Sequence, residues 1–274
     1  MLDDRPVSFV GAHTFGFAWD IDAAEATRRL IGAGFSHIQY LAACPHFDAW
    51  DATGTGVSAV RRALLSGGAT ALAVDLPSSE TNLASVNPEV VRFSLDAYLK
   101  VLDRAADLGA RWVTVNGGRR HGLLPPPDNR LMSILAGAME TLSRTAERRG
   151  VRLLIENIPG SLLATTPEIA AFLSMAGLPN IDVLYDVANA AAAGEQPVDG
   201  IAALAPNIGL VHLSDAPKGA WKHDVIGSGQ IDFGAIRAEL VRQRYAGGAV
   251  VEIISRNALG DLRASRQTLV ESGW

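Results

Sequence analysis

Eight short apolar runs alternate with amphipathic segments along this chain, and that alternation restricts the fold more than any other feature. The apolar runs, each predicted to be a strand, cover residues 7–13, 35–42, 70–77, 111–118, 153–160, 181–186, 208–215 and 249–255. The predicted helices cover residues 22–34, 58–68, 87–109, 128–150, 166–177, 200–205, 233–242 and 260–270. Such alternation indicates a parallel sheet with right-handed crossovers, and eight units favour closure. The predicted fold is α/β, a (β/α)8 TIM barrel.

Length and composition agree with a single barrel of this kind. One α/β barrel takes about 250 residues, and the chain has 274, of which 48% are hydrophobic and 19% are charged. No linker or low-complexity tract interrupts the chain, so we expect one domain over residues 1–274. The first predicted strand is not followed by a glycine-rich phosphate-binding turn, which disfavours a dinucleotide-binding sheet.

Charge and cysteine content argue against several classes of protein. A net charge of −5 provides no electrostatic footprint for a phosphate backbone, so nucleic acid is not an expected partner. Cys44 is the only cysteine, which rules out an internal disulfide and a cysteine-rich zinc site. The amino terminus lacks the basic region and apolar run of a secretory signal, and no later segment reaches about 18 uncharged apolar residues. We expect a cytoplasmic protein with no membrane partner.

Four of the apolar runs each carry one metal-ligating residue near the carboxyl end. They are Glu156, Asp186, His212 and Glu252, separated by 30, 26 and 40 positions (156 to 186, 186 to 212 and 212 to 252). Each spacing leaves room for a strand, a helix and their loops. Because the carboxyl ends of parallel strands converge on one mouth, the four side chains should meet there. One acidic residue at a strand end is more often a helix cap or ion-pair partner, but four in consecutive units indicate a shared site.

A divalent metal ion gives these four residues a common purpose. Three crowded carboxylates would repel one another and raise at least one pKa, whereas a cation neutralises them and accepts an imidazole as well. We therefore predict one divalent ion as cofactor, in an active site at the carboxyl ends of the strands. Oxygen-rich ligation with one nitrogen suits Mn, Mg, Co or Fe and tolerates Zn, and the sequence does not choose among them.

Several segments together resemble a known superfamily. They are LLIEN, YDVANA, VHLSD followed by HDVIGSGQIDF, and VVEI, with GAHTFGFAW near the start and NLASVNPEVVRFSLDAYLKVLDRAADLGA in the middle. Together they resemble the xylose isomerase-like TIM barrels, which include sugar phosphate isomerases and epimerases, ketose 3-epimerases, inosose dehydratases and the endonuclease type that acts at abasic sites in DNA. The resemblance spans nearly the whole chain and implies the same fold.

This resemblance implies roles for the residues at the strand ends. The four ligand candidates would bind a single metal ion, and Glu156 and Glu252 would also be the catalytic acid and base on opposite faces of the substrate. An ion beside the carbonyl and hydroxyl oxygens of an α-hydroxyketone acidifies the C–H between them, so one glutamate can remove the proton and the other return it. His223 lies where relatives place a basic residue that polarises the substrate oxygens. A surface histidine is the alternative, and Lys218 and Lys222 share its loop.

Other side chains are candidates for contact with the substrate. The predicted substrate-binding residues are Asn189, His13, Trp221 and Lys222. Aromatic residues just beyond the strands could stack on a sugar, although ordinary loop packing would explain them as well: Phe15, Phe17, Trp19, Phe47, Trp50 and Trp221. Gly227 and Gly229 are expected to form tight turns.

The chain also departs from the family pattern at several positions. Gln39 stands where many relatives carry a glutamate at the end of the second strand, so a catalytic role there is in doubt. Asn189 replaces a histidine and can bond a hydroxyl but cannot shuttle protons. The endonuclease branch holds three zinc ions with additional histidines and an aspartate, at positions where this chain has Asp75, Leu76, Asn116 and Trp221. A nuclease is therefore the weakest interpretation.

These observations favour a metal-dependent isomerase or epimerase that acts on a small polyhydroxylated ketone or aldehyde, either a carbohydrate or a cyclitol. The same bases could expel a leaving group, so a lyase acting on an inosose or a 3-keto glycoside is an alternative. A non-catalytic, carbohydrate-sensing or partner-binding barrel is a second alternative. A homo-oligomer is also possible, yet no heptad or exposed apolar stripe identifies an interface.

Overall fold

The computed structural model describes residues 7–274, and its centre is a closed barrel of eight parallel strands in sequence order. Each strand pairs in parallel with the next, and β8 closes the ring by pairing with β1. The strands are β1 (Val10–His13), β2 (His37–Leu41), β3 (Thr70–Asp75), β4 (Trp112–Asn116), β5 (Arg152–Glu156), β6 (Ile181–Asp186), β7 (Ile208–Leu213) and β8 (Gly248–Val251). The predicted (β/α)8 barrel is confirmed. The expectation for the extreme amino terminus concerns residues 1–6, which lie outside the described residues.

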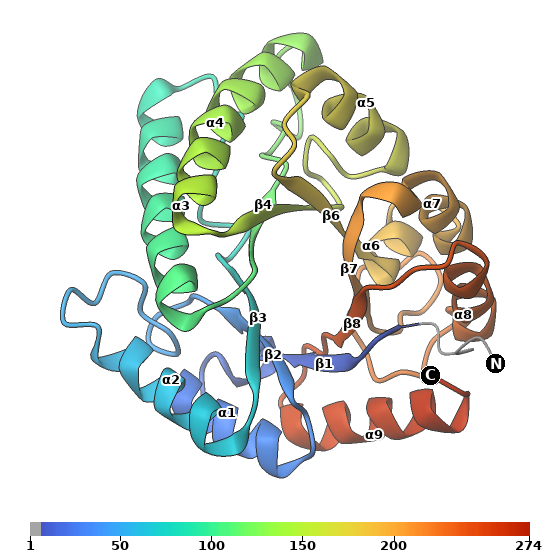
Figure 1. Cartoon of the computed structure of the whole chain (residues 1–274). Helices are drawn as coiled ribbons and strands as arrows, with labels where there is room; N and C mark the ends of the chain where they lie inside the picture. Colours follow the sequence, from blue (N-terminus) through green and yellow to red (C-terminus); the bar gives the residue numbers. More distant parts are fainter. Residues whose placement is uncertain (1–6) are drawn as a thin grey trace.

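Helices surround the ring of strands (Figure 1). They are α1 (Ala23–Gly32), α2 (Thr55–Gly67), α3 (Pro88–Leu108), α4 (Asp128–Arg149), α5 (Thr166–Ala176), α6 (Val187–Ala192), α7 (Pro197–Leu204), α8 (Phe233–Arg242) and α9 (Ala258–Glu271), with short 3-10 turns at Phe15–Phe17 and Ala205–Asn207. Among residues 7–274, no helix is both long and apolar enough to cross a bilayer.

Local sequence signals explain most helix boundaries. The Asp22 side chain caps α1 by accepting a hydrogen bond from the backbone N–H of Glu25. Gly109 and Gly150 end α3 and α4 in left-handed conformations, which a residue with a side chain adopts at a cost. The prediction missed α6, because its alanine-rich sequence has no amphipathic period, and it began α7 too late, at residue 200.

The barrel interior is layered along the strands. An apolar cluster inside the barrel includes one residue from each of the last four strands: Leu154, Leu184, Leu210 and Val250. Successive side chains of a strand point to opposite faces, so the residues two positions further on point inward as well. Those residues are the four ligand candidates, which therefore form a polar layer above an apolar floor.

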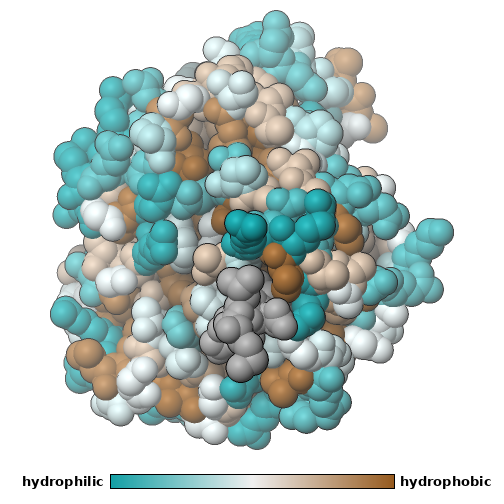
Figure 2. All heavy atoms as spheres, turned by 45° about the vertical axis from the view of Figure 1, so that its right-hand side comes forward, coloured by the Kyte–Doolittle hydropathy of each residue, from teal (hydrophilic) through white to brown (hydrophobic). Residues whose placement is uncertain are grey.

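The molecular surface is mixed. On the face that Figure 2 shows, hydrophilic side chains interrupt small groups of hydrophobic ones. That face offers no basis for choosing an oligomer interface, and the homo-oligomer stays a prediction.

Asp182 ties together three strands at the amino-terminal end of the barrel. The guanidinium of Arg152 in β5 donates to both carboxylate oxygens, at 2.7 and 2.8 Å, and the indole of Trp112 in β4 donates at 3.0 Å. Burial raises the pKa of Asp182, but the hydrogen bonds from Arg152 and Trp112 outweigh burial and hold the pKa below its usual range. Asp182 is therefore a stabilising carboxylate at neutral pH.

We predict that Asp182→Asn lowers the free energy of unfolding by about 1–3 kcal/mol at neutral pH, because charged hydrogen bonds are lost. The pKa of Asp182 is lower in the folded than in the unfolded chain. Its contribution is therefore present above the unfolded pKa and is lost as the pH falls through the folded pKa. Urea unfolding at several pH values should show the gap between variant and wild type closing toward acid.

Glu89→Gln is the matched control. Glu89 pairs with Arg92 on the surface, where both side chains are 68% exposed, so the substitution should change stability far less than Asp182→Asn. A pH-independent deficit in Asp182→Asn would contradict the assigned role of this carboxylate.

Candidate metal centre and active site

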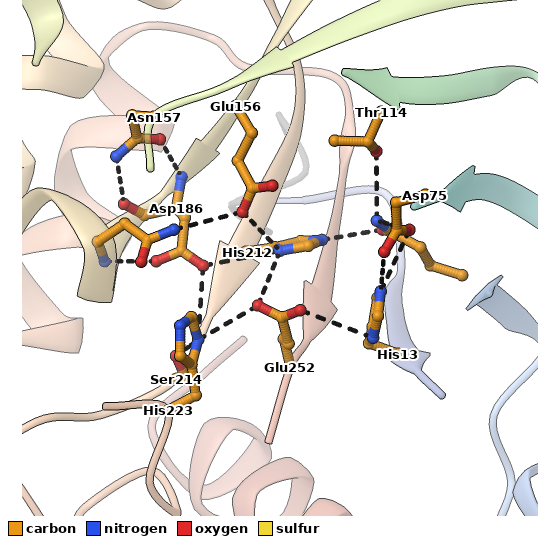
Figure 3. A network of polar contacts seen from close by, with 12 residues as sticks. His13, Asp75, Thr114, Glu156, Asn157, Asp186, His212, Ser214, His223 and Glu252 are labelled. Carbon is orange, nitrogen blue, oxygen red and sulfur yellow. Dashed lines mark hydrogen bonds and ion pairs between the residues drawn. The ribbon is translucent and has the colours of Figure 1, made fainter. Parts of the chain in front are cut away.

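The four ligand candidates meet at the carboxyl end of the barrel (Figure 3). Glu156 and Asp186 are the last residues of β5 and β6, His212 lies in β7, and Glu252 directly follows β8. One donor atom from each of the four lies within 4.8 Å of the others. The structure thus brings together the residues that the spacing predicted, and their role as ligands stays a prediction.

Two atoms of this cluster indicate that it fits a cation. Asp186 Oδ2 and His212 Nδ1 are buried and have no hydrogen-bond partner. The nearest carboxylate oxygens to His212 Nδ1 belong to Glu252, Asp186 and Glu156, at 3.3, 3.6 and 3.9 Å. Buried polar atoms without partners are costly, and three carboxylates with one imidazole are a common donor set for a divalent ion. The residues present therefore fit one divalent metal ion.

Asp186 is held in place by its neighbours. The side chain of Asn157 donates to the backbone carbonyl of Asp186 at 2.9 Å and accepts from its backbone N–H at 2.8 Å. Asp186 Oδ1 accepts from the backbone N–H of Asn189 at 2.6 Å and so caps α6. Asp186 is thus a helix cap, as the simplest interpretation of a strand-end aspartate requires, and its second oxygen is still left facing the cluster.

The two glutamates have opposite electrostatic environments. Burial, together with the nearby carboxylates of Glu252 and Asp186, holds the pKa of Glu156 well above its usual range. Burial acts in the same direction on Glu252, but His212 and His223 outweigh it and hold the pKa of Glu252 well below its usual range. A pair of carboxyl groups with pKa values driven apart is the arrangement that acid–base catalysis uses.

His212 is connected on its other side to β2 and β3. Its Nε2 lies 2.9 Å from Oε1 of Gln39, and Nε2 of Gln39 donates to Oδ1 of Asp75 at 2.9 Å. The carboxylate of Asp75 also contacts Nε2 of His13, at 3.0 Å. No segment of the sequence signals these contacts directly, although Gln39 and Asp75 also lie at or near the carboxyl ends of strands.

His223 lies beside the cluster on the loop between β7 and α8. Its Nδ1 is 3.0 Å from the hydroxyl of Ser214 and 3.2 Å from Oε2 of Glu252. Burial lowers the pKa of His223, but the negative charges of Glu252 and Asp186 outweigh burial and raise the pKa to about 9. A charged imidazole therefore adjoins the cavity.

Asp215 fixes the shape of this loop. Its carboxylate accepts the backbone N–H groups of Gly227, Gly229 and Ile231, at 2.9, 2.9 and 3.1 Å. Gly227 has φ +92°, and a Cβ on Gly229 would lie 2.3 Å from an Asp215 oxygen. The predicted tight turn is present at Gly227, and Gly229 allows the close approach of Asp215, whereas sequence patterns do not point to Asp215.

Two members of the cluster, Glu156 and Glu252, line a cavity of about 490 Å³. Asn189, Trp221 and Lys222 line it, as do Glu156, Glu252 and His223. The indole of Trp221 donates to Oδ1 of Asn189 at 2.7 Å, and Nδ2 of Asn189 donates to Oε1 of Glu156 at 3.3 Å. These lining residues can therefore contact a ligand and one another.

Some expected contacts differ from the structure. Of the six aromatic residues, Phe15 and Trp221 line the cavity, whereas Phe17 and Phe47 belong to the hydrophobic core and Trp19 and Trp50 point to solvent. Position just after a strand does not determine which way a loop side chain turns. His13 is buried beside the cluster rather than in the cavity wall, because its ring bonds Asp75 and the backbone N–H of Phe15.

Sequence comparison identifies proteins that are similar to parts of this chain. A protein of Methanocaldococcus jannaschii, described as uncharacterized, is 27% identical over 209 residues, which cover 73% of this chain and 69% of that protein. A probable endonuclease 4 of Mycobacterium ulcerans is 34% identical over 161 residues, 55% of this chain and 61% of that protein. Inosose dehydratase 1 of Bacillus cereus is 24% identical over 197 residues, 61% of this chain and 65% of that protein. The chain thus spans less than two thirds of the length of the endonuclease and of the dehydratase.

Solved structures resemble the barrel along its whole length. A D-tagatose 3-epimerase-like protein superposes with a TM-score of 0.85 and 19% identity, over 96% of both chains. An L-ribulose 3-epimerase superposes with a TM-score of 0.81 and 20% identity, over 96% of this chain and 93% of that one. At identities this low, the superpositions show a shared fold alone. Several of these proteins bear the names of enzymes, namely an epimerase, a dehydratase and a probable endonuclease.

The decisive comparison is with a family model. Residues 28–272 match the model described as xylose isomerase-like TIM barrel, a span that includes all four residues of the cluster. The eight-stranded closed barrel agrees with that description. The chain belongs to the xylose isomerase-like TIM barrel family.

Proposed function

We propose that the protein is a divalent-metal-dependent isomerase or epimerase acting on a sugar-like α-hydroxyketone or aldehyde. The observation that carries this proposal is the pair Glu156 and Glu252, which line one cavity with pKa values driven apart beside the unpartnered donors of Asp186 and His212. Names among the structural neighbours, such as L-ribulose 3-epimerase, support the same reaction class.

The two glutamates divide the proton transfers. Glu252, held as a carboxylate by neighbouring histidines, removes the proton from the carbon next to the carbonyl and leaves an enediolate. Glu156 lines the same cavity, and burial with the neighbouring carboxylates raises its pKa in the metal-free site, so it is the group that returns a proton. Delivery to the opposite face of the same carbon epimerises it, and delivery to the neighbouring carbon isomerises the sugar. When bound, a divalent ion would supply electrostatic stabilisation of the negative charge that develops on the substrate oxygens.

The cavity wall favours an uncharged substrate. Besides the acid Glu156, three carboxylates line it, against the single lysine Lys222 and the imidazole of His223: Asp75, Asp224 and Glu252. A phosphate ester would bring further negative charge close to these groups. The indole of Trp221 and the ring of Phe15 provide apolar faces for the C–H surface of a sugar. We therefore propose a neutral carbohydrate or cyclitol.

A lyase acting on an inosose or a 3-keto glycoside is the second candidate. His223 favours it, because a cationic imidazole 3.2 Å from Glu252 could protonate a departing hydroxyl after Glu252 has removed the carbon-bound proton. The similarity to inosose dehydratase 1 is in line with this reaction. The mass of the product separates the candidates, since elimination releases water or an aglycone.

Nuclease action has less support, despite the similarity to a probable endonuclease 4. That branch of the family is expected to hold three zinc ions. Within residues 7–274, a single group of three or more metal-ligating side chains is close enough to share an ion.

A sensing barrel without turnover would bind sugar and metal yet release no product.

We predict that Glu156→Gln and Glu252→Gln each retain the fold and lose about 10²–10⁴-fold in turnover, because each removes one acid–base group. Deuterium incorporation at the substrate carbon in deuterated water, measured by mass spectrometry, provides the test. Full exchange in either variant would contradict the two-base mechanism. Asp20→Asn, which alters an exposed carboxylate, is the control and should exchange at the wild-type rate.

We also predict that a divalent ion stabilises the protein. Mn²⁺ at about 100 times its Kd should raise the free energy of unfolding by about 2.7 kcal/mol, and a chelator should reverse the gain. Asp186→Asn should abolish the response, since asparagine keeps the helix cap but replaces the free oxygen by an NH₂ group. Thermal melts with and without Mn²⁺ test this expectation, and an equal response in the variant would contradict it.

The proposed substrate class has its own test. In a mass-resolved screen of ketoses, inososes and their phosphate esters, we expect neutral compounds to have kcat/KM at least about tenfold above that of their phosphates, equivalent to about 1.4 kcal/mol. A preference for phosphate esters would contradict the argument from the cavity charge while leaving the reaction class intact.

A further inference from the structure

Three buried side chains from β2, β3 and β7 form a continuous series of hydrogen bonds at the base of the cavity, which the residue from β3 also lines (Figure 3). Gln39 stands in the middle, 2.9 Å from Asp75 on one side and 2.9 Å from His212 on the other. The exposed fractions of Gln39, Asp75 and His212 are 0, 9 and 1%. Because solvent hardly reaches these atoms, their hydrogen bonds must be made to one another and to the buried neighbours His13 and Thr114.

Asp75 determines which group donates and which accepts in each hydrogen bond of the series. The Nδ1 atom of His13 accepts the backbone N–H of Phe15 at 2.9 Å, so the proton of this ring is on Nε2, which lies 3.0 Å from Asp75. Asp75 thus receives N–H donors from both His13 and Gln39, as an ionised carboxylate does. The NH₂ group of Gln39 must therefore face Asp75.

The orientation of Gln39 then determines the tautomer of His212. With its NH₂ group turned to Asp75, Gln39 presents its carbonyl oxygen to Nε2 of His212. An amide oxygen only accepts, so Nε2 of His212 must carry a proton. The lone pair of the neutral ring is then on Nδ1, the atom that lies 3.3–3.9 Å from the carboxylate oxygens of the cluster.

We propose that Asp75, acting through Gln39, sets the tautomer of His212 and thereby the affinity of the cluster for a divalent ion. The inference rests on the metal site of the proposed function. Asp75 and Gln39 are positioning residues in this scheme, since they act through His212.

The pairing also accounts for a departure from the family pattern. A glutamate, which the resemblance places at position 39 in many relatives, offers only acceptor atoms when ionised and can face a histidine N–H without further help. A glutamine can present either its oxygen or its NH₂ group. Gln39 therefore needs a neighbour that accepts only, and Asp75 is that neighbour.

Asp75→Asn should disturb the series without adding bulk. The new NH₂ group can donate to the oxygen of Gln39, which turns the NH₂ group of Gln39 toward His212. Nε2 of His212 must then accept, the proton moves to Nδ1, and binding of the ion is hindered. We expect affinity for Mn²⁺ to fall about 10–100-fold, the usual range for partners of ligating histidines. Gln39→Met, which removes both contacts, should lose a similar factor.

In the double variant Asp75→Asn with Gln39→Glu, residue 39 should again present an oxygen to Nε2 of His212. The carboxylate introduced at position 39 would accept from the amide introduced at position 75 on one side and from His212 on the other. The number of buried carboxylates equals that of the wild type, and we expect this variant to bind Mn²⁺ nearly as tightly as the wild type. Such strong non-additivity is the sign of two residues acting through one contact.

Asn180→Leu is the matched control for loss of a buried amide. Its side chain donates to the carbonyl of Val151 at 3.1 Å, in the turn before β6 at the opposite end of the barrel. The variant should lose stability but keep the wild-type affinity for Mn²⁺. Urea unfolding in chelator checks that every variant folds.

Isothermal titration calorimetry with Mn²⁺ gives the affinities, and ¹⁵N NMR of the Zn²⁺-loaded protein reports which nitrogen of His212 binds the ion. Weak binding in Asp75→Asn and Gln39→Met, with recovery in the double variant, is the expected result. Wild-type affinity in both single variants, or no recovery in the double variant, would contradict the proposed role of Asp75 and Gln39. Failure of the wild type to bind any divalent ion would instead overturn the proposed metal site, on which the role of Asp75 and Gln39 depends.

Discussion

Three carboxylates and an imidazole share a buried layer at one end of the barrel, and the balance of charge in that layer governs the site. Glu156, Asp186 and Glu252 would repel one another if left without positive charge. The raised pKa values of His212 and His223 reflect the same need, since each imidazole gains from holding a proton there. When His212 is charged, both of its nitrogens carry protons, so binding of an ion through Nδ1 would release the proton of that nitrogen.

The register of the strands brings the four polar side chains into one layer of the barrel. In the last four strands, each polar residue of the cluster follows an apolar residue of the barrel interior by two positions. A shift of one residue would turn the polar side chains toward the surrounding helices and would expose the apolar floor. The same hydrophobic packing that closes the barrel therefore also aims the four donors at one point.

Sequence patterns predict whatever depends on local periodicity and on strand ends. The eight strands, most helices and the convergence of Glu156 with Glu252 follow from such patterns. Contacts across strands, such as Gln39 with Asp75, depend on register and rotamers, which no single segment encodes. The short helix α6 escapes prediction because an alanine-rich turn lacks a period. For Phe47 the structure selects the loop-packing alternative, because loop side chains can turn inward. The extent of the domain, residues 1–274, stays a prediction.

Asn189 shows how a substitution changes the chemistry available within a shared fold. A histidine at this position could exchange protons, whereas an amide can only orient its neighbours. The indole of Trp221 donates to the amide oxygen of Asn189, which leaves the NH₂ group to face Glu156. Trp221 also lines the cavity and is 55% exposed, so a substrate that packs on the indole contacts the group that orients Asn189. Binding in the cavity and alignment of Glu156 are thereby linked through two side chains.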